Sequence, residues 1–154
     1  MGLFDWVCAP ATCLDCGTRT EGVLLGQTKL HPLARQNELK VGDELPLSPE
    51  AADDARYTVL SSAPTGAGRI LQLWECPACR SRSQWFEVAV SDGRITSIES
   101  VKLDLGLLRE ANYVDDESLL MTAGALPDSP PLLDDPKEAL RLLRAFLGKP
   151  GPTA

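Results

Sequence analysis

The chain has little histidine, few aromatic residues and no surplus of positive charge. A single histidine, His31, among 154 residues leaves little scope for histidine-based acid–base catalysis or for a catalytic triad. Aromatic residues make up 5% of the chain, so aliphatic side chains must supply most of its core. The formal net charge is −7, whereas proteins that bind nucleic acid carry excess Lys and Arg along one face. We therefore expect a non-enzymatic protein, and we disfavour nucleic acid as its partner.

The sequence also lacks the features of membrane insertion and export. No apolar stretch approaches the roughly 20 residues of a transmembrane helix. The N-terminal segment contains Asp5 and Asp15 and has neither a basic stretch nor a long apolar run, so we expect no signal peptide. Trp6 occupies the position where a myristoylation motif needs Ser or Thr. These absences predict a cytoplasmic protein without a membrane partner, in a compartment that disfavours disulfides.

Against these absences stands a distinctive arrangement of cysteines. Four of the five cysteines form two Cys-x-x-Cys pairs, Cys13 with Cys16 and Cys76 with Cys79. A two-residue gap lets a tight turn aim both sulfurs at one cation about 2.3 Å away, with N–H groups of the turn facing the sulfurs. We predict one four-cysteine site that binds zinc. Iron is the less favoured ion. It stays an alternative because sites made of four sulfurs accept both metals.

The residues around the pairs refine this prediction. Gly17, just after the first pair, supplies the left-handed backbone that such a turn often needs. Arg80 holds the equivalent place in the second pair and predicts a less regular exit from that turn. A redox Cys-x-x-Cys would precede a helix, but residues 80–84 have the composition of a turn. Cys8 fits no standard ligand gap and is expected to be a buried thiol, and His31 is expected to be a surface imidazole, although each is a spare candidate ligand.

The pattern of apolar residues predicts strands through the first two-thirds of the chain. Apolar residues at 70–74 and 85–90 predict strands on either side of the second cysteine pair. Asp92-Gly93 is a hairpin signal, and it predicts an antiparallel hairpin over about 84–103. Shorter strands are expected at 23–30, 44–47 and 57–60, with a loop or one helical turn at 48–56. The predicted fold is mainly β with a C-terminal helix, a zinc-ribbon-like antiparallel sheet pinned by two Cys-x-x-Cys knuckles.

Composition divides the chain into two predicted parts. Residues 1–103 are expected to form the metal-pinned β domain, with a long insertion of 59 residues between Cys16 and Cys76. Residues 104–154 are more acidic and contain a proline-rich linker at 126–131, so they are expected to form an extension of that domain.

The extension is predicted to end in a helix over 136–147. Asp135 can cap the first turn, Pro136 suits the first helical position, and Gly148 marks the end. The helix is too short to be stable alone, so its apolar face must pack on this chain's own sheet or on a partner. The candidate partner-binding side chains on that face are Leu140, Leu143, Phe146 and Leu147.

Short motifs resemble those of a known group of proteins. The opening Met1–Asp5, the Cys-x-x-Cys soon after it, Gln27-Thr28-Lys29 and Val41-Gly42-Asp43 are similar to a group of small bacterial and phage zinc-ribbon proteins. The resemblance covers about the first 100 residues, implies a small intracellular metal-stabilised domain and supplies no catalytic residues. The two knuckles are also similar to those of rubredoxins, which bind iron through four thiolates.

These observations favour a non-enzymatic, zinc-stabilised binding or adaptor protein that acts through contacts with a protein partner. A metal bound by four thiolates has no open position for water, so its role would be structural. The alternative is a rubredoxin-like electron-transfer or dithiol redox protein that uses the same cysteines. A nucleic-acid-binding zinc ribbon is the third choice.

Overall fold

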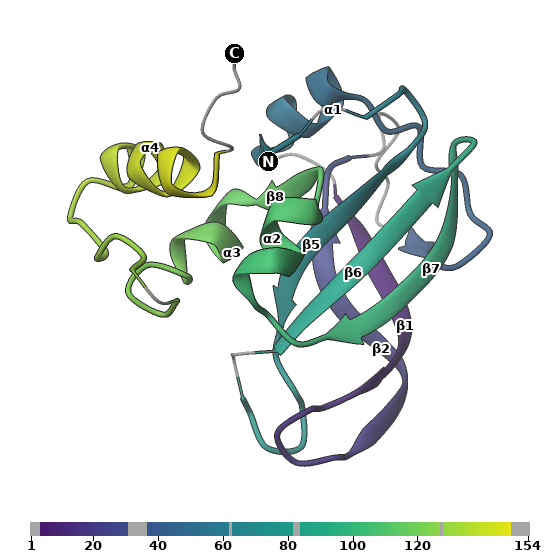
Figure 1. Cartoon of the computed structure of the whole chain (residues 1–154). Coiled ribbons are helices and arrows are strands. Elements are labelled where there is room, and N and C mark those ends of the chain that lie inside the picture. Colours follow the sequence, from purple (N-terminus) through teal and green to yellow (C-terminus); the bar gives the residue numbers. More distant parts are fainter. Residues whose placement is uncertain (1–3, 31–36, 62, 82–83, 127, 149–154) are drawn as a thin grey trace.

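In a computed structural model of the chain, residues 4–30, 37–61, 63–81, 84–126 and 128–148 are described. They form eight strands and four helices (Figure 1). The strands are β1 (Asp5–Thr12), β2 (Arg19–Thr28), β3 (Glu38–Leu39), β4 (Tyr57–Val59), β5 (Gly68–Trp74), β6 (Gln84–Ser91), β7 (Arg94–Val101) and β8 (Tyr113–Asp115). The helices are α1 (Pro49–Asp54), α2 (Leu105–Glu110), α3 (Asp116–Leu120) and α4 (Pro136–Leu147).

The strands form two sheets. A three-stranded sheet has the order β2-β1-β3, and a five-stranded sheet has the order β4-β8-β5-β6-β7. The β1–β2, β5–β6 and β6–β7 neighbours are antiparallel, whereas β3 runs parallel to β1 and β8 runs parallel to β5. The predicted fold class is confirmed: the chain is mainly β with antiparallel pairing, a C-terminal helix and two Cys-x-x-Cys knuckles that lie near each other.

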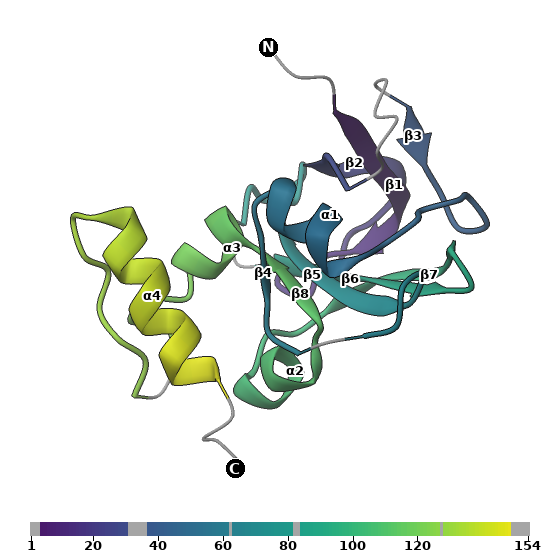
Figure 2. The same cartoon turned by 90° about the horizontal axis from the view of Figure 1, so that it is seen from above.

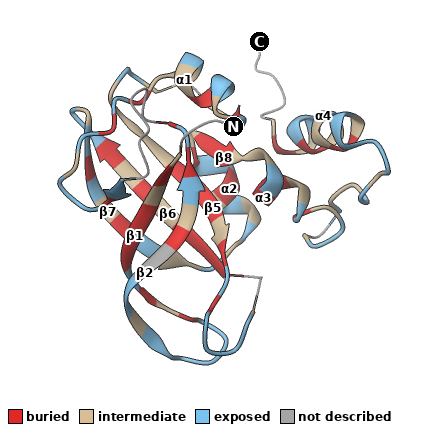
Figure 3. Cartoon of the chain, turned by 180° about the vertical axis from the view of Figure 1, so that it is seen from behind, coloured by how far each residue is buried: buried red, intermediate tan, exposed pale blue. Residues whose placement is uncertain are grey.

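The five-stranded sheet is buried on both faces (Figures 1 and 3). On β5 and β6, Ile70, Phe86 and Val88 belong to the core shared with the three-stranded sheet. Their neighbours Leu71 and Trp85 point to the opposite face, because successive side chains of a strand alternate, and they pack in a second core with α2, α3 and α4. The molecule therefore has three layers: a small sheet, a larger sheet and helices.

A polar bridge connects the two sheets inside the first core. The Tyr57 hydroxyl donates a 2.6 Å hydrogen bond to the side-chain oxygen of Gln72 on β5. The Gln72 side-chain nitrogen in turn donates to the Gln27 carbonyl oxygen of β2 at 3.1 Å. Gly26 permits this approach, because a Cβ there would lie 2.5 Å from the same Gln72 nitrogen. Glycine at this place in β2 thus serves a close contact between sheets.

The predicted hairpin at 84–103 is present as β6 and β7. Its turn, Asp92-Gly93, has φ values of 53° and 74°, which are the left-handed angles of a tight two-residue hairpin turn. The strand expected at 44–47 is absent, and that segment contributes only one bridge, from Glu44 to Arg94. Pro46 has no N–H to donate to a ladder, which explains why no strand continues there.

Other predicted elements are shifted or replaced. The strand expected at 23–30 is longer at its start and forms β2. The segment 48–56 contains α1, in which the Ser48 hydroxyl accepts a hydrogen bond from the Ala51 N–H at 3.1 Å. Within the described residues, no helix has the length and apolar character needed to cross a membrane.

The C-terminal part contacts the sheet in two ways. β8 pairs with both β5 and β4, so the segment after residue 103 supplies a strand to the larger sheet. α4 has the predicted bounds, begins at a cap where Asp135 accepts from the Lys137 N–H, and lies beside α3 (Figure 2). The division of the chain at residue 103, into a metal-pinned β domain and an extension, stays a prediction.

Helix α4 packs on the second core of its own chain, which is one of the two arrangements expected from its apolar face. Leu143 and Leu147 are buried in the second core, and Leu140 and Phe146 pack against it. The binding of a partner by these four side chains stays a prediction.

Candidate metal centre

The two cysteine pairs lie in the turns of two hairpins that come from different sheets. The first knuckle, residues 13–18, joins β1 to β2, and the second knuckle begins at residue 76 in the connection from β5 to β6. Both connections reach the same end of the molecule, at the bottom of Figures 1 and 3. Hairpins far apart in the sequence therefore present their cysteines to each other.

The two knuckles, 13–18 and 76–81, have the same backbone hydrogen bonds. In the first, the Cys13 N–H donates to the Thr18 carbonyl and the Gly17 N–H donates to the Cys13 carbonyl, both at 2.9 Å. In the second, the equivalent bonds run from Cys76 to Ser81 at 3.1 Å and from Arg80 to Cys76 at 2.8 Å.

The backbone angles of the two knuckles match as well. Gly17 has φ of 75° and Arg80 has φ of 62°, so both adopt the left-handed conformation that closes the turn. The prediction that the chain leaves the second turn less regularly, at Arg80, is therefore wrong. The knuckle's own hydrogen bonds hold the arginine in a conformation that disfavours a side chain.

The four cysteine sulfurs converge on one point. All four Sγ atoms lie within 4.8 Å of one another, and no other group of this kind occurs among the described residues. The Cys13 and Cys79 sulfurs are 3.7 Å apart, and the Cys16 and Cys76 sulfurs are 3.8 Å apart. In a tetrahedron of sulfurs about 2.3 Å from a zinc ion, neighbouring sulfurs lie about 3.8 Å apart. The donor set and its spacing therefore fit a single tetrahedral metal ion.

Each knuckle supplies one buried and one exposed cysteine. Cys13 and Cys76 are buried, whereas Cys16 and Cys79 face solvent. The Cys16 N–H points at the Cys13 sulfur at 3.4 Å, and the Thr18 hydroxyl lies 3.3 Å from the Cys16 sulfur. Hydrogen bonds of this kind offset negative charge on metal-bound thiolates.

The pKa values of the exposed thiols move in opposite directions. Hydrogen bonding from Thr18 lowers the pKa of Cys16 to about 6, so this sulfur ionises readily. At Cys79 a hydrogen bond from the Ser81 backbone favours the thiolate, but desolvation and the three neighbouring sulfurs outweigh it and raise the pKa to about 12. A thiolate at one position of the cluster thus opposes the ionisation of a neighbouring thiol at this spacing. A bound dication would supply the charge that allows all four sulfurs to be thiolates.

Two side-chain contacts join the first knuckle to the second knuckle and to the strand that follows it. The Leu14 N–H, in the first knuckle, donates a 2.7 Å hydrogen bond to the side-chain oxygen of Gln84, the first residue of β6. The Ser81 hydroxyl, in the second knuckle, donates to the carboxylate of Asp15 in the first. Sequence reasoning missed these contacts, because Gln84 and Ser81 belong to a segment with only a general turn composition.

The remaining candidate ligands lie apart from the cluster or outside the described residues. Cys8 is buried in β1, and its thiol lies 3.5 Å from the Gly22 carbonyl oxygen, so it is not part of the four-sulfur group. His31 falls outside the described residues.

No protein-family model, curated protein or solved structure matches this chain. The two Cys-x-x-Cys pairs, placed to bind one metal ion, are consistent with a zinc-ribbon-like motif. The resemblance to the small bacterial and phage zinc-ribbon proteins stays a prediction.

Proposed function

We propose that this protein is a non-enzymatic binding module that acts through protein–protein contacts and is stabilised by one zinc ion. The observation that carries the proposal is the convergence of four cysteine sulfurs from two hairpins, with spacings that fit a tetrahedral ion. Cys13, Cys16, Cys76 and Cys79 would hold the ion. Four sulfur ligands leave no position for a reacting water, so the ion is assigned a structural role.

The position of the centre supports a stabilising role. One hairpin belongs to the three-stranded sheet and the other to the five-stranded sheet. An ion shared by the two knuckles cross-links the sheets at one end, where Leu14 and Asp15 already bond to Gln84 and Ser81. Binding free energy at such a site contributes directly to folding, because the unfolded chain lacks the preformed cluster.

The surface near the centre supports a binding role. Leu14, between the two ligands of the first knuckle, is 51% exposed, and Met121 is 59% exposed. Both line a groove that also contains Trp85. Exposed apolar side chains gathered at one groove are typical of protein contact sites, whereas the net charge of −7 opposes nucleic acid.

Metal content and capture of partners test the two halves of the proposal separately. Native mass spectrometry of the purified protein should show one zinc per chain that a chelator removes. A metal-free folded protein in which all four thiols alkylate freely would contradict the zinc site. For the binding half, cross-linking in the host should capture the same proteins with wild type and Cys8→Ser, and fewer with Cys76→Ser.

Iron is the second candidate, because the exposed sulfurs of Cys16 and Cys79 would bring a redox ion close to a partner's surface. The colour of the protein separates the two candidates: a ferric tetrathiolate is red and the zinc form is colourless. Red protein with one iron per chain, purified from medium that contains both metals, would favour electron transfer.

A further inference from the structure

The two exposed cysteines of the metal centre, Cys16 and Cys79, can be reached by small reactive molecules. They belong to different knuckles, and each lies beside the buried cysteine of the opposite knuckle. The Cys16 and Cys76 sulfurs are 3.8 Å apart, and the Cys79 and Cys13 sulfurs are 3.7 Å apart. An accessible thiolate with a second cysteine sulfur next to it is the arrangement typical of oxidant-sensing cysteines.

We propose that the centre is a reversible redox switch, which releases its zinc ion when a small hydroperoxide such as hydrogen peroxide oxidises two of the cysteines. Oxidation joins an exposed cysteine of one knuckle to the buried cysteine of the other, Cys16 to Cys76 or Cys79 to Cys13. This inference rests on the proposed function, because it requires zinc at the four cysteines, and it adds a form of regulation to that site.

The reaction has two steps, described here for Cys16 and Cys76. The Cys16 thiolate attacks one oxygen of hydrogen peroxide, the O–O bond breaks, and a sulfenic acid and a hydroxide ion form. The Cys76 thiolate then attacks the Cys16 sulfur, the S–O bond breaks, and a disulfide and a second hydroxide ion form. The two sulfurs lose two electrons, the peroxide gains them, and the hydroxide ions take up protons to become water. Two thiolates remain, which are too few for a four-sulfur zinc site.

The contacts and the loop lengths favour a disulfide between the knuckles over one within a knuckle. The facing sulfurs of Cys16 and Cys76 must approach by less than about 2 Å to reach the length of a disulfide bond. That bond spans 60 residues of the chain, whereas a bond from Cys13 to Cys16 spans three. A disulfide that closes a longer loop stabilises the fold more, and by linkage the fold favours that disulfide more.

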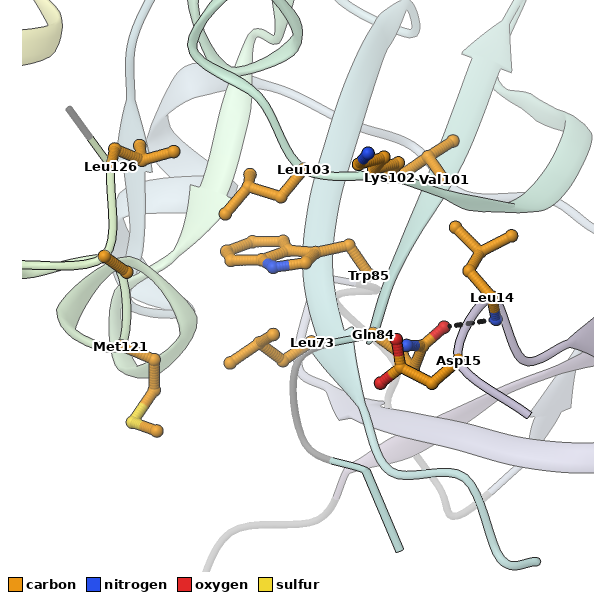
Figure 4. Close-up of a pocket in the computed structure, with 11 residues that line it drawn as sticks. Leu14, Asp15, Leu73, Gln84, Trp85, Val101, Lys102, Leu103, Met121 and Leu126 are labelled. Atoms are coloured by element: carbon orange, nitrogen blue, oxygen red, sulfur yellow. Dashed lines mark hydrogen bonds between the residues drawn. The ribbon is translucent and has the colours of Figure 1, made fainter. Parts of the chain in front are cut away.

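Hydrogen bonds away from the sulfurs hold the knuckles in position for this reaction. The Leu14 N–H of the first knuckle donates to the Gln84 side chain, and the Asp15 carboxylate accepts from the Ser81 hydroxyl of the second knuckle (Figure 4 shows the first of these bonds). Neither bond uses a cysteine side chain, so both can persist when the sulfurs are oxidised. The disulfide then joins the two sheets in place of the ion, and we expect the oxidised protein to stay folded.

The test treats the full-length, zinc-loaded protein with hydrogen peroxide and measures released zinc with a chromogenic chelator, against a sample without peroxide. One zinc ion should be released for each disulfide formed. Peptide mapping without reduction should find Cys16 linked to Cys76 or Cys79 linked to Cys13. Dithiothreitol and added zinc should restore the starting zinc content. Dimedone, which traps sulfenic acids, should label Cys16 and Cys79 in preference to the two buried cysteines.

Cys8→Ser is the matched control, because Cys8 is a buried thiol outside the cluster. This variant should release zinc on peroxide treatment as wild type does. In oxidised wild type, Cys8 should be recovered as a free thiol. Circular dichroism of the oxidised protein should retain the β signal of the zinc-loaded form.

Three results would overturn the inference. The first is zinc that stays bound while free glutathione in the same solution is oxidised, and the second is disulfides confined to Cys13–Cys16 and Cys76–Cys79. The third is zinc release with sulfinic or sulfonic acids that dithiothreitol does not reverse, which would make the reaction damage. The proposed function fails separately: protein that holds no zinc before peroxide is added contradicts the zinc site, whereas zinc-loaded protein that is insensitive to peroxide loses only the switch.

Discussion

The Leu14 N–H and the Gln84 side-chain oxygen, 2.7 Å apart, connect the first knuckle to the strand that leaves the second. Gln84 is buried, so this bond lies in a site with little competing water. It positions the residues between Cys13 and Cys16. The cysteines are thereby held close together by the hairpins themselves, and this reduces the ordering that a metal ion must impose.

Gln84→Ala should lower the free energy of unfolding by about 1–2 kcal/mol, because it removes a buried hydrogen bond and leaves a small cavity. It should also weaken zinc binding in competition with a chelator. Gln27→Ala is the control, because that side chain is exposed and only its carbonyl accepts from Gln72. Equal denaturant midpoints for the two variants would remove Gln84 from the support of the site.

Cys76→Ser should cost several kcal/mol of stability, because zinc binding at a structural site is coupled to folding. Cys8→Ser should cost much less, since the Cys8 sulfur lies outside the cluster and makes a hydrogen bond only to the Gly22 carbonyl among the described residues. Thermal melts with and without chelator measure the difference. If chelator destabilises wild type and Cys76→Ser by the same amount, the ligand assignment is wrong.

Gly17 and Arg80 have the same left-handed backbone conformation, so adding a side chain at one and removing it at the other should change stability in opposite directions. Gly17→Ala should destabilise the protein by about 1 kcal/mol, and Arg80→Gly should stabilise it by a similar amount, because both positions have φ above 60°. The Arg80 ion pair with Glu75 is exposed and its loss should cost little. Denaturant titrations of the zinc-loaded variants check the signs, and two changes of the same sign would contradict the shared turn geometry.

Gly26→Ala should destabilise the protein by about 1–3 kcal/mol through overpacking between the sheets. The added methyl would lie 2.5 Å from the Gln72 side-chain nitrogen and 3.3 Å from the Phe86 ring. Gln72→Ala in the same chain should recover part of this loss, because it removes the nearest atom. A double-mutant cycle measures the coupling, and strictly additive effects would contradict the clash.

Leu143→Ala should lower the free energy of unfolding by about 2–5 kcal/mol, since the side chain is buried in the second core. Leu132→Ala, at a position that is 65% exposed, should change it by less than about 0.5 kcal/mol. Chemical denaturation measures both values. A small effect of Leu143→Ala on stability, together with a loss of captured partners, would assign this helix face to partner binding.

Local sequence signals predicted the parts of the fold that depend on neighbouring residues. The Cys-x-x-Cys spacing predicted the four-sulfur cluster, Asp92-Gly93 predicted the β6–β7 turn, and the Asp135 cap with Pro136 predicted the start of α4. Each signal acts within a few residues, so the sequence shows it directly.

Features that depend on distant contacts were not predicted. β1 was missed because it contains Pro10 and two alanines, which disfavour a strand. The structure accommodates Pro10 at an irregularity in the pairing of β1 with β2, where no N–H is required. β8 has only three residues and forms because β4 and β5 flank it. The bond between Leu14 and Gln84 spans 70 residues and has no local signature.

The contact between α4 and β4 has a consequence for self-association. β4 ends the five-stranded sheet, and Arg144 of α4 donates a 3.0 Å hydrogen bond to the hydroxyl of its middle residue, Thr58. Thr58 donates to Asp116, whose carboxylate also lies 3.5 Å from Arg144. Edge strands whose neighbours detach can pair with strands of other molecules. Arg144 places a charged side chain at this edge, and charge on an edge strand opposes such pairing. We therefore expect a chain that lost its last helix to lose solubility as well as stability.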